Sequence, residues 1–390
     1  MIPSFHIANT PHIHFGVGKI EQLPSLIQSF GQRVLIVTGN HSFIQSDHWS
    51  KLQTRLQDLN IEWQTWAITG EPSPEMIDGC VKKYGAADIQ LVIAIGGGSV
   101  VDAGKAIAAM LHLTDSIQDY LEGVGTKKHD GQTLPFIAVP TTAGTGSEAT
   151  KNAVISSVGS SGFKKSLRHN NFVPNIALID PTLMVSCPAQ LTANSGMDAF
   201  TQLLESYLST KANRMTDALA LDGLKGIRDG LLTAYQDGHN IAARRNMAYA
   251  TLISGITLAN VGLGTVHGFA SSVGGRVAVP HGVVCGTLMG IVNKITLQKL
   301  RKVDVDNIAL KKYTITGQLF AEHTHQSATY YQDYLIDLLE GWTEKLGLPT
   351  FSTYGMTENM IPSIVQKTGN KNNPVALSEE ELIMVLKNRL

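Results

Sequence analysis

The segment Leu91-Val-Ile-Ala-Ile-Gly-Gly-Gly-Ser-Val-Val-Asp102 decides the fold of this 390-residue chain. A short apolar run ends here in three glycines, and a helical pattern begins directly after them. A continuous apolar run predicts a parallel strand that is covered on both faces. Glycine lets the backbone approach an anion closely, and the first N–H groups of a helix attract negative charge. The segment therefore predicts a phosphate-binding turn, with a plain tight turn capped by Ser99 as the alternative.

Strand and helix patterns alternate on both sides of this segment. Strands are predicted at 34–38, 61–68, 91–95, 136–139 and 176–179, with helices at 47–59 and 75–84. After about residue 186 helical spacing dominates, over 193–207, 216–233, 241–261 and 280–299. The pattern predicts an α/β nucleotide-binding domain with a parallel sheet over residues 1–185, followed by an all-α domain over residues 186–390.

Composition limits the classes of function. With 43% hydrophobic and 16% charged residues the chain has the profile of a globular enzyme, and its net charge of -1 gives no pull toward nucleic acid or an anionic membrane. The first residues lack the basic and apolar regions of a signal peptide, so we expect a cytoplasmic protein without a membrane partner. Cys80, Cys187 and Cys285 are widely spaced and predict reduced thiols rather than a disulfide framework or a zinc knuckle.

A second polar turn, Pro140-Thr-Thr-Ala-Gly-Thr-Gly-Ser-Glu148, follows the strand predicted at 136–139. It supplies several hydroxyl groups and two glycines. Ligands of open α/β sheets bind beyond the carboxyl ends of the strands, where both turns lie. The two turns together favour a nucleotide or sugar-phosphate site over an accidental arrangement.

Three segments of the second half carry candidate metal ligands. Asp198 and Gln202 are four residues apart, so a helix places both on one face. His267 and His281 lie in the sequences GLGTVHGFA and VPHG. A carboxylate and two imidazoles suit Fe²⁺ or Zn²⁺ with an open position, and such an ion assists hydride transfer between an alcohol and a carbonyl compound. The alternative is that the histidines are ordinary core residues and that Asp198 interacts with a helix dipole.

The chain resembles the group III, or iron-containing, alcohol dehydrogenases, which are related in fold to glycerol dehydrogenase and dehydroquinate synthase. The resemblance covers essentially the whole chain and rests on GGGSVVDAGKA, PTTAGTGSEAT, ALIDPTL, SGMDAFTQLLESY, GLGTVHGFA and PHG. It implies a dehydroquinate synthase-like fold, an active site in the cleft between the domains, and a homodimer or larger homo-oligomer. It also implies that the substrate is a small alcohol, aldehyde or ketone, with NAD(P) as hydride carrier.

The resemblance assigns roles to individual residues. The metal ligands and catalytic residues are Asp198, His267 and His281. The cofactor contacts are Gly97, Gly98 and Ser99 at the pyrophosphate, Thr141, Thr142 and Thr145 near the nicotinamide, Lys164 at a ribose, and Ser73 near the adenine.

This sequence departs from the family at three places. Gln202 stands where the fourth metal ligand is normally histidine, and a neutral amide oxygen is a weaker ligand. Ser271 replaces a histidine that is credited in many relatives with proton relay. NAD-specific relatives often carry Asp after the first strand, whereas this chain reads Thr38-Gly-Asn-His-Ser42. The groups of Gly39, Asn40 and Ser42 are suited to a 2′-phosphate, so we expect NADP(H) in preference to NAD(H).

Three other functions remain open from the sequence. They are a metal-independent reductase resembling maleylacetate reductase, a lyase resembling dehydroquinate synthase, and a non-catalytic nucleotide-binding protein. The GTGSE and VHGFA segments favour the dehydrogenase over the lyase. We expect the substrate pocket to be lined partly by Lys151, Asn152, Phe163 and residues near Phe269.

Overall fold

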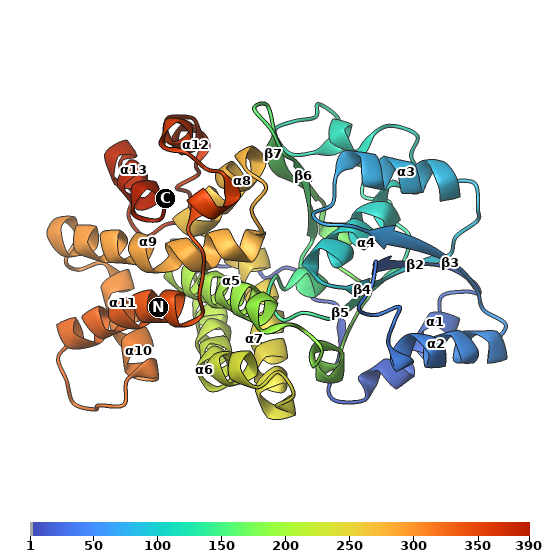
Figure 1. The fold of residues 1–390 in the computed structure, drawn as a ribbon, viewed down its shortest axis with the longest axis horizontal. Helices are drawn as coiled ribbons and strands as arrows, with labels where there is room; N and C mark the ends of the chain where they lie inside the picture. The colour runs from blue at the N-terminus through green and yellow to red at the C-terminus, as the bar shows by residue number, and fades with distance from the viewer. Residues whose placement is uncertain (1–2) are drawn as a thin grey trace.

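A twisted sheet of six parallel strands forms the centre of the N-terminal half (Figure 1). The computed structural model describes residues 3–390. The strand order is β1-β8-β5-β4-β2-β3. The strands are β1 (His12–Phe15), β2 (Arg33–Gly39), β3 (Glu62–Ile68), β4 (Leu91–Gly96), β5 (Phe136–Pro140) and β8 (Ile176–Ile179).

Helices cover both faces of the sheet, which explains why its central strands are apolar throughout. Leu35 and Val92 point into a core under α3 (Pro74–Tyr84) and α4 (Gly98–Met110). Ile36 and Ile93 point into the opposite core under α1 (Leu23–Gln28) and α2 (Asp47–Asp58). Figure 1 shows the two pairs of helices on opposite sides of the strands. The predicted α/β domain with a parallel sheet is confirmed.

A short antiparallel hairpin follows β5, and the sequence patterns did not predict it. It consists of β6 (Asn152–Ser157) and β7 (Phe163–Arg168). β6 packs against α4, and β7 packs against α8 of the C-terminal half. The hairpin therefore joins the two halves (Figure 1). Lys164 lies on its second strand.

From residue 189 to the C-terminus the chain forms helices and no β-strand. They are α5 (Ala189–Leu208), α6 (Arg214–Gln236), α7 (Ile241–Val261), α8 (Thr265–Arg276), α9 (His281–Val303), α10 (Ile308–Phe320), α11 (Ala328–Lys345), α12 (Ile361–Lys367) and α13 (Glu379–Asn388). The all-helical second half is thus confirmed. The predicted division at residues 185 and 186 falls between the 3-10 turn Pro181–Met184 and α5.

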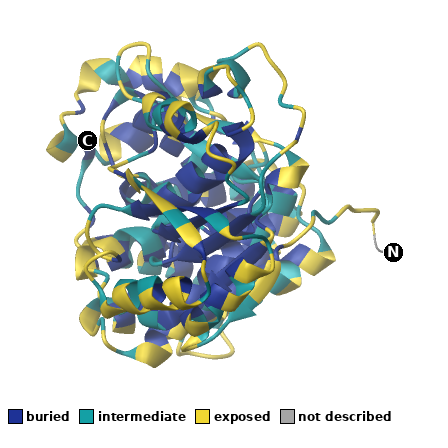
Figure 2. Cartoon of the chain, turned by 90° about the vertical axis from the view of Figure 1, so that its right-hand side faces the viewer, coloured by how far each residue is buried: buried dark blue, intermediate teal, exposed yellow. Residues whose placement is uncertain are grey.

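The helical half has two apolar cores. One lies among α5, α6, α7 and α11, and the other lies beneath α8, α9, α12 and α13. Figure 2 shows the buried residues running through the middle of the molecule, with exposed residues on the outer faces of the helices. Within residues 3–390 no single helix is long and apolar enough to cross a bilayer, although α7 and α8 together, bent by 95°, meet that criterion by length and composition.

Candidate active site

The two polar turns that the sequence singles out lie against each other. Gly97 caps the N-terminus of α4, and a Cβ at that position would come within 3.4 Å of the side chain of Thr142. A Cβ at Gly98 would overlap the side chain of Thr145. The backbone N–H of Thr141 donates to the carbonyl of Gly96 at 2.9 Å. Close packing of the turns therefore requires glycine at Gly98, whereas the contact at Gly97 is an ordinary one; both glycines permit a close approach of a phosphate.

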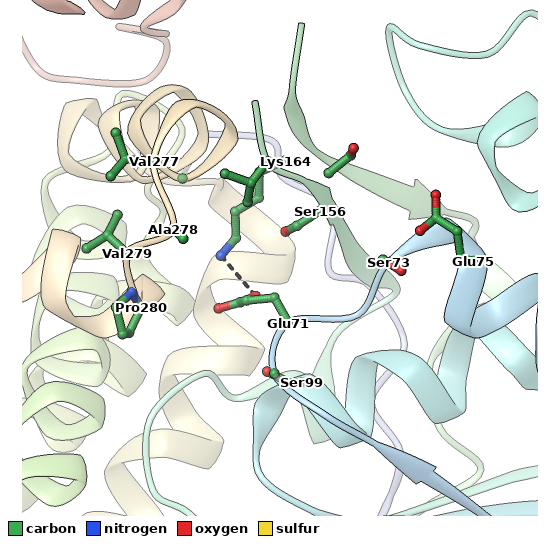
Figure 3. A pocket seen from close by; sticks show the side chains of 14 residues that line it. Glu71, Ser73, Glu75, Ser99, Ser156, Lys164, Val277, Ala278, Val279 and Pro280 are labelled. Carbon is green, nitrogen blue, oxygen red and sulfur yellow. Dashed lines mark ion pairs between the residues drawn. The ribbon is translucent and has the colours of Figure 1, made fainter. Parts of the chain in front are cut away.

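A cleft of about 610 Å³ opens beside these turns, between the two halves of the chain (Figure 3). One wall is formed by the loop before α3, by Ser99 at the start of α4 and by the hairpin. The other wall is formed by the end of α8 and by the segment that leads into α9. The lining residues that Figure 3 labels are Glu71, Ser73, Glu75, Ser99, Ser156, Lys164, Val277, Ala278, Val279 and Pro280.

An ion pair joins Lys164 of the hairpin to Glu71 in the loop before α3, on the same wall of the cleft. Lys164 Nζ lies 3.0 Å from Glu71 Oε2, and Figure 3 shows the two side chains pointing toward each other. Burial raises the pKa of Glu71, but Lys164 and His281 outweigh this effect and lower it, so the carboxylate is ionised. Ser73 lines the same cleft, where its hydroxyl caps α3 by accepting from the N–H of Met76 at 3.4 Å.

The residues that favour NADP(H) in the sequence lie at the end of β2. Gly39 is the last residue of this strand, and the Asn40 amide donates to Thr69 Oγ1 at 2.6 Å. Ser42 is exposed. A Cβ at Gly39 would meet Val100 Cγ2 at 3.9 Å, which is an ordinary contact. This position therefore has room for a larger side chain.

The predicted metal ligands converge, and a cysteine joins them. Asp198 comes from α5, His267 from α8, and both His281 and Cys285 from α9. Asp198 Oδ1 lies 3.3 Å from His267 Nε2 and 3.6 Å from His281 Nε2. The sulfur of Cys285 lies 3.6 Å from His267 Nε2 and 3.7 Å from His281 Nε2. The four potential ligand atoms all lie within 4.8 Å of one another.

The charges and lone pairs of this cluster fit a divalent cation. Asp198 is 1% exposed, and its Oδ1 has no hydrogen-bond partner of adequate geometry among residues 3–390. Burial raises the pKa of Asp198, but His281 and His267 lower it to about 2, so the carboxylate is ionised. A buried carboxylate oxygen that faces two imidazole nitrogens and a sulfur is a donor set for Fe²⁺ or Zn²⁺.

Burial and the neighbouring charges determine the protonation states of the other three side chains in this cluster. Burial lowers the pKa of His281 to about 4 and raises the pKa of Cys285 to about 12, so both are neutral near pH 7. Burial also opposes protonation of His267, but Cys285, Asp198 and Glu205 raise its pKa well above the ordinary value. Cation binding displaces such protons, because ligands bind in their deprotonated forms.

Glu205 fixes the orientation of His267, and the sequence analysis did not single it out. Its Oε2 lies 2.7 Å from His267 Nδ1, and its Oε1 accepts from the N–H of Val266 at 2.7 Å. The side chain is 5% exposed. The carboxylate holds the Nδ1 proton, so Nε2 of His267 faces the cluster and can bind a cation once it loses its proton. The available signal was the spacing of seven residues from Asp198, which places both on one face of a helix.

Gln202 and Ser271 are engaged by neighbouring groups. Gln202 is 2% exposed, and its Oε1 accepts from the hydroxyl of Ser254 at 2.7 Å. The Ser271 hydroxyl donates to the backbone carbonyl of His267 at 3.3 Å. Gln202 is predicted to contribute a metal ligand. In the structure, the Ser254 hydroxyl competes with an ion for its oxygen.

One residue expected to line the substrate pocket lies outside this cleft. Lys151 does not line the cleft: its ammonium donates to Asn170 Oδ1 at 2.9 Å, and it lies in a separate depression beside Lys211. Phe269 is itself fully buried in the core beneath α8 and α9, although Gly274 on the same helix lines the cleft.

The cysteines within residues 3–390 are free thiols, as expected. Cys285, however, lies beside the two predicted histidine ligands. The spacing of the three cysteines from one another does not reveal this contact. His281 and Cys285 are four residues apart, which on a helix brings their side chains together. That spacing was the signal that could have found it.

Comparisons with known proteins point to one family. Residues 10–181 match the family described as iron-containing alcohol dehydrogenase, and residues 192–390 match its C-terminal family. Alcohol dehydrogenase 4 of Saccharomyces cerevisiae is 33% identical over 290 residues, which are 74% of this chain and 75% of that protein. The NAD-dependent methanol dehydrogenase of Bacillus methanolicus is 28% identical over 384 residues, covering 96% and 97%. A solved alcohol dehydrogenase from Oenococcus oeni has a TM-score of 0.87 at 26% identity, covering 99% of this chain and 100% of that one.

Proposed function

This chain belongs to the iron-containing alcohol dehydrogenase family, and on that premise we propose that it interconverts a small alcohol and its aldehyde or ketone by metal-assisted, NAD(P)-dependent hydride transfer. The alcohol is primary or secondary. Its carbon gives a hydride to the nicotinamide ring, and its hydroxyl gives a proton to the protein or to water. In the reverse direction the carbonyl carbon accepts the hydride and its oxygen accepts the proton.

The observation that carries this proposal is the continuity between the cleft and the metal-ligand cluster. Ser99 and Lys164 line the cleft on the nucleotide side, and Pro280 lines it on the helical side. His281 follows Pro280 directly and faces Asp198. A dinucleotide whose phosphates lie at the glycine turn therefore extends along the cleft toward the cluster.

The residues of this chain have separate tasks in the proposed reaction. The turns at Gly97 and Gly98 bind the pyrophosphate, and Thr141, Thr142 and Thr145 contact the nicotinamide half. Lys164 donates to a ribose oxygen, with Glu71 holding its ammonium in place. Asp198, His267 and His281 hold the divalent ion. When bound, such an ion polarises the carbonyl group and stabilises the negative charge that develops on its oxygen.

We further propose that NADP(H) is preferred over NAD(H), and that the protein is a cytoplasmic homodimer or larger oligomer. Support for the cofactor preference comes from the end of β2, where Gly39 and Asn40 place no carboxylate that would repel a 2′-phosphate. The NAD dependence named for the Bacillus methanolicus relative makes NAD(H) the competing outcome.

The test is a reductase assay with short aldehydes and ketones. NADPH and NADH are supplied separately, to protein loaded with Zn²⁺ or Fe²⁺ and to protein treated with a chelator. We expect loss of nicotinamide absorbance that requires the metal and is faster with NADPH. Undiminished activity after complete metal removal would instead support a metal-independent reductase. Failure to oxidise either cofactor with any carbonyl compound would favour a lyase or a non-catalytic nucleotide-binding protein.

A matched pair of variants separates the metal ligand from a general loss of charge. Asp198→Asn removes the buried carboxylate of the cluster, and we expect kcat/KM to fall by at least about 100-fold. Asp58→Asn removes an exposed carboxylate whose partner Arg55 is also exposed, and we expect activity to be unchanged. Equal effects of the two substitutions would contradict the proposed role of Asp198.

A further inference from the structure

We propose that Cys285, rather than Gln202, supplies the fourth protein ligand of the metal site, and that the resulting set of one oxygen, two nitrogens and one sulfur favours zinc over iron. This inference rests on the metal-assisted function proposed above. It concerns the identity of a ligand and of the ion, and it stands on the placement of side chains in the cluster.

The distances in the cluster match tetrahedral zinc geometry. Zinc bonds of about 2.0–2.1 Å to nitrogen or oxygen and about 2.3 Å to sulfur place neighbouring N and S atoms about 3.6 Å apart, and neighbouring N and O atoms about 3.3 Å apart. Cys285 Sγ lies 3.6 and 3.7 Å from the Nε2 atoms of His267 and His281. Asp198 Oδ1 lies 3.3 and 3.6 Å from the same two atoms. Little movement is therefore needed to complete a tetrahedron.

The environment of these atoms also points to a cation at their centre. Cys285 is fully buried, and Asp198 Oδ1 is a buried carboxylate oxygen without a hydrogen-bond partner within residues 3–390. Glu205 turns Nε2 of His267 toward the same point. The donor atoms carried by α5, α8 and α9 thus face one another within 4.8 Å.

The amide oxygen of Gln202 already has a hydrogen-bond partner, which competes with this role. Its Oε1, the only atom of the amide that could bind a cation, accepts from Ser254 at 2.7 Å. Ser254 also donates to the carbonyl of Thr251 at 2.8 Å, so the hydroxyl bridges α5 and the backbone of α7. The cysteine lies one helical turn after His281 and supplies a stronger ligand than an amide oxygen.

Sulfur changes which ion is favoured. Thiolate is a soft ligand that is common at zinc sites, and zinc also stands above Fe²⁺ in the general order of affinities. An ionised carboxylate and a thiolate together balance the two positive charges of the ion. Zinc accepts a fifth ligand when required, so four protein donors do not close the site to chemistry.

A second cluster of potential ligands does not compete. His112, His129 and Asp130 lie together in the nucleotide-binding half. Both ring nitrogens of His129 are engaged, however, by the carbonyl of Ala109 and by the N–H of Gly131, each at 3.0 Å. His129 therefore has no free lone pair to offer, and we assign no ion to this cluster.

The experiment measures metal binding to the full-length protein after removal of bound metal, without reference to turnover. Affinities for Zn²⁺ and for Fe²⁺ under anaerobic conditions are measured by competition with a chelator. Co²⁺ is added as a spectroscopic probe, because a thiolate bound to Co²⁺ gives a charge-transfer band in the near ultraviolet. Three variants are compared with the wild-type chain: Cys285→Ser, Gln202→Leu and Cys80→Ser.

Each variant has a defined purpose. Cys285→Ser removes the proposed ligand, whereas Cys80→Ser places the same hydroxyl at another fully buried cysteine, in the core beneath α3 and α4. Gln202→Leu removes the amide at nearly constant size, and Ser254 keeps its bond to Thr251. The thermal midpoint of each metal-free variant separates a folding defect from the loss of a ligand.

We expect one Zn²⁺ per chain and a charge-transfer band in the wild-type protein. In Cys285→Ser the band is lost and the Kd for zinc rises by more than about 100-fold, the upper end of what loss of an outer-shell partner costs. The factor by which the same substitution raises the Kd for iron is at least about tenfold smaller. Gln202→Leu and Cys80→Ser keep the band and the zinc affinity.

Two contrary results would be distinguishable. A wild-type protein that binds the ion tightly but shows no charge-transfer band, and loses affinity on Gln202→Leu rather than on Cys285→Ser, would overturn this inference while leaving metal assistance intact. A wild-type protein that binds neither zinc nor iron would overturn metal assistance itself.

Discussion

Replacing Glu205 by Gln tests whether the orientation of His267 governs metal binding. The Glu205 carboxylate accepts two hydrogen bonds, one from His267 Nδ1 and one from the N–H of Val266, each at 2.7 Å. Glutamine has one oxygen and one NH₂ group, so it can accept only one of these bonds at a time. Its NH₂ group then faces a donor, and the negative charge behind the imidazole is lost.

The magnitude follows from the bond that is removed. A hydrogen bond to a charged group contributes about 1.5–3 kcal/mol, and each factor of ten in affinity corresponds to about 1.4 kcal/mol. We therefore expect Glu205→Gln to weaken Zn²⁺ binding by about 10–100-fold, which agrees with the usual effect of altering the partner of a metal-bound histidine. The value of kcat/KM falls in parallel in protein that is incompletely loaded.

The assay is zinc competition with a chelator, together with thermal unfolding of the metal-free protein. Glu340→Gln is the matched control, because this carboxylate pairs with Lys294 at 3.0 Å on a partly exposed surface. We expect that control to leave the Kd for zinc unchanged. The reasoning would be refuted if Glu205→Gln lowered the thermal midpoint but left zinc affinity at the wild-type value, since the role of Glu205 would then be structural alone.

Three further predictions use other parts of the structure. Gly39→Asp has room beside Val100 and places a carboxylate at the end of β2, so we expect the ratio of kcat/KM for NAD to that for NADP to rise at least about tenfold; a constant ratio would show that this position does not face the ribose. Gly98→Ala forces a Cβ into Thr145, so we expect the Kd of the nicotinamide cofactor to rise at least about tenfold in a binding titration, with zinc affinity retained; unaltered cofactor binding would place the cofactor elsewhere. Burial raises the pKa of Glu148 to about 7 from its usual 4.5, so the folded chain holds this proton longer than the unfolded chain and loses stability as pH rises between these two values. Glu148→Gln should remove this loss and raise unfolding stability at pH 8 relative to pH 4.5 by up to about 3 kcal/mol, as followed by thermal unfolding at both pH values; identical pH profiles for the two proteins would contradict this.

The sequence predicted the α/β half well because its signals are local. The strand at Leu91–Gly96 is apolar on both faces, and a Cβ at Gly96 or Gly98 would overlap a neighbouring side chain. The hairpin of β6 and β7 escaped prediction for the opposite reason. Phe163–Arg168 is rich in basic residues, and its strand character depends on packing against α8, which only the folded chain provides.

The candidate site was likewise only partly predictable from the sequence. Asp198, His267 and His281 were found because their residue types are typical metal ligands in a recognisable order. Cys285 and Glu205 were missed because their roles depend on contacts between helices that are far apart in the sequence. Gln202 shows the converse, since its position on α5 was predicted and its bond to Ser254 was not.

The join between Pro280 and His281 has a consequence for how the two ligands of this protein communicate. Pro280 contacts the space in which the dinucleotide is proposed to lie, and the next side chain reaches the ion site. If occupation of one site moved this short segment, the geometry of the other site would change. By thermodynamic reciprocity, if the dinucleotide tightens retention of the ion by some factor, the ion tightens the hold on the dinucleotide by the same factor. If both ligands bind as proposed, the start of α9 would link the binding of the dinucleotide to the binding of the ion.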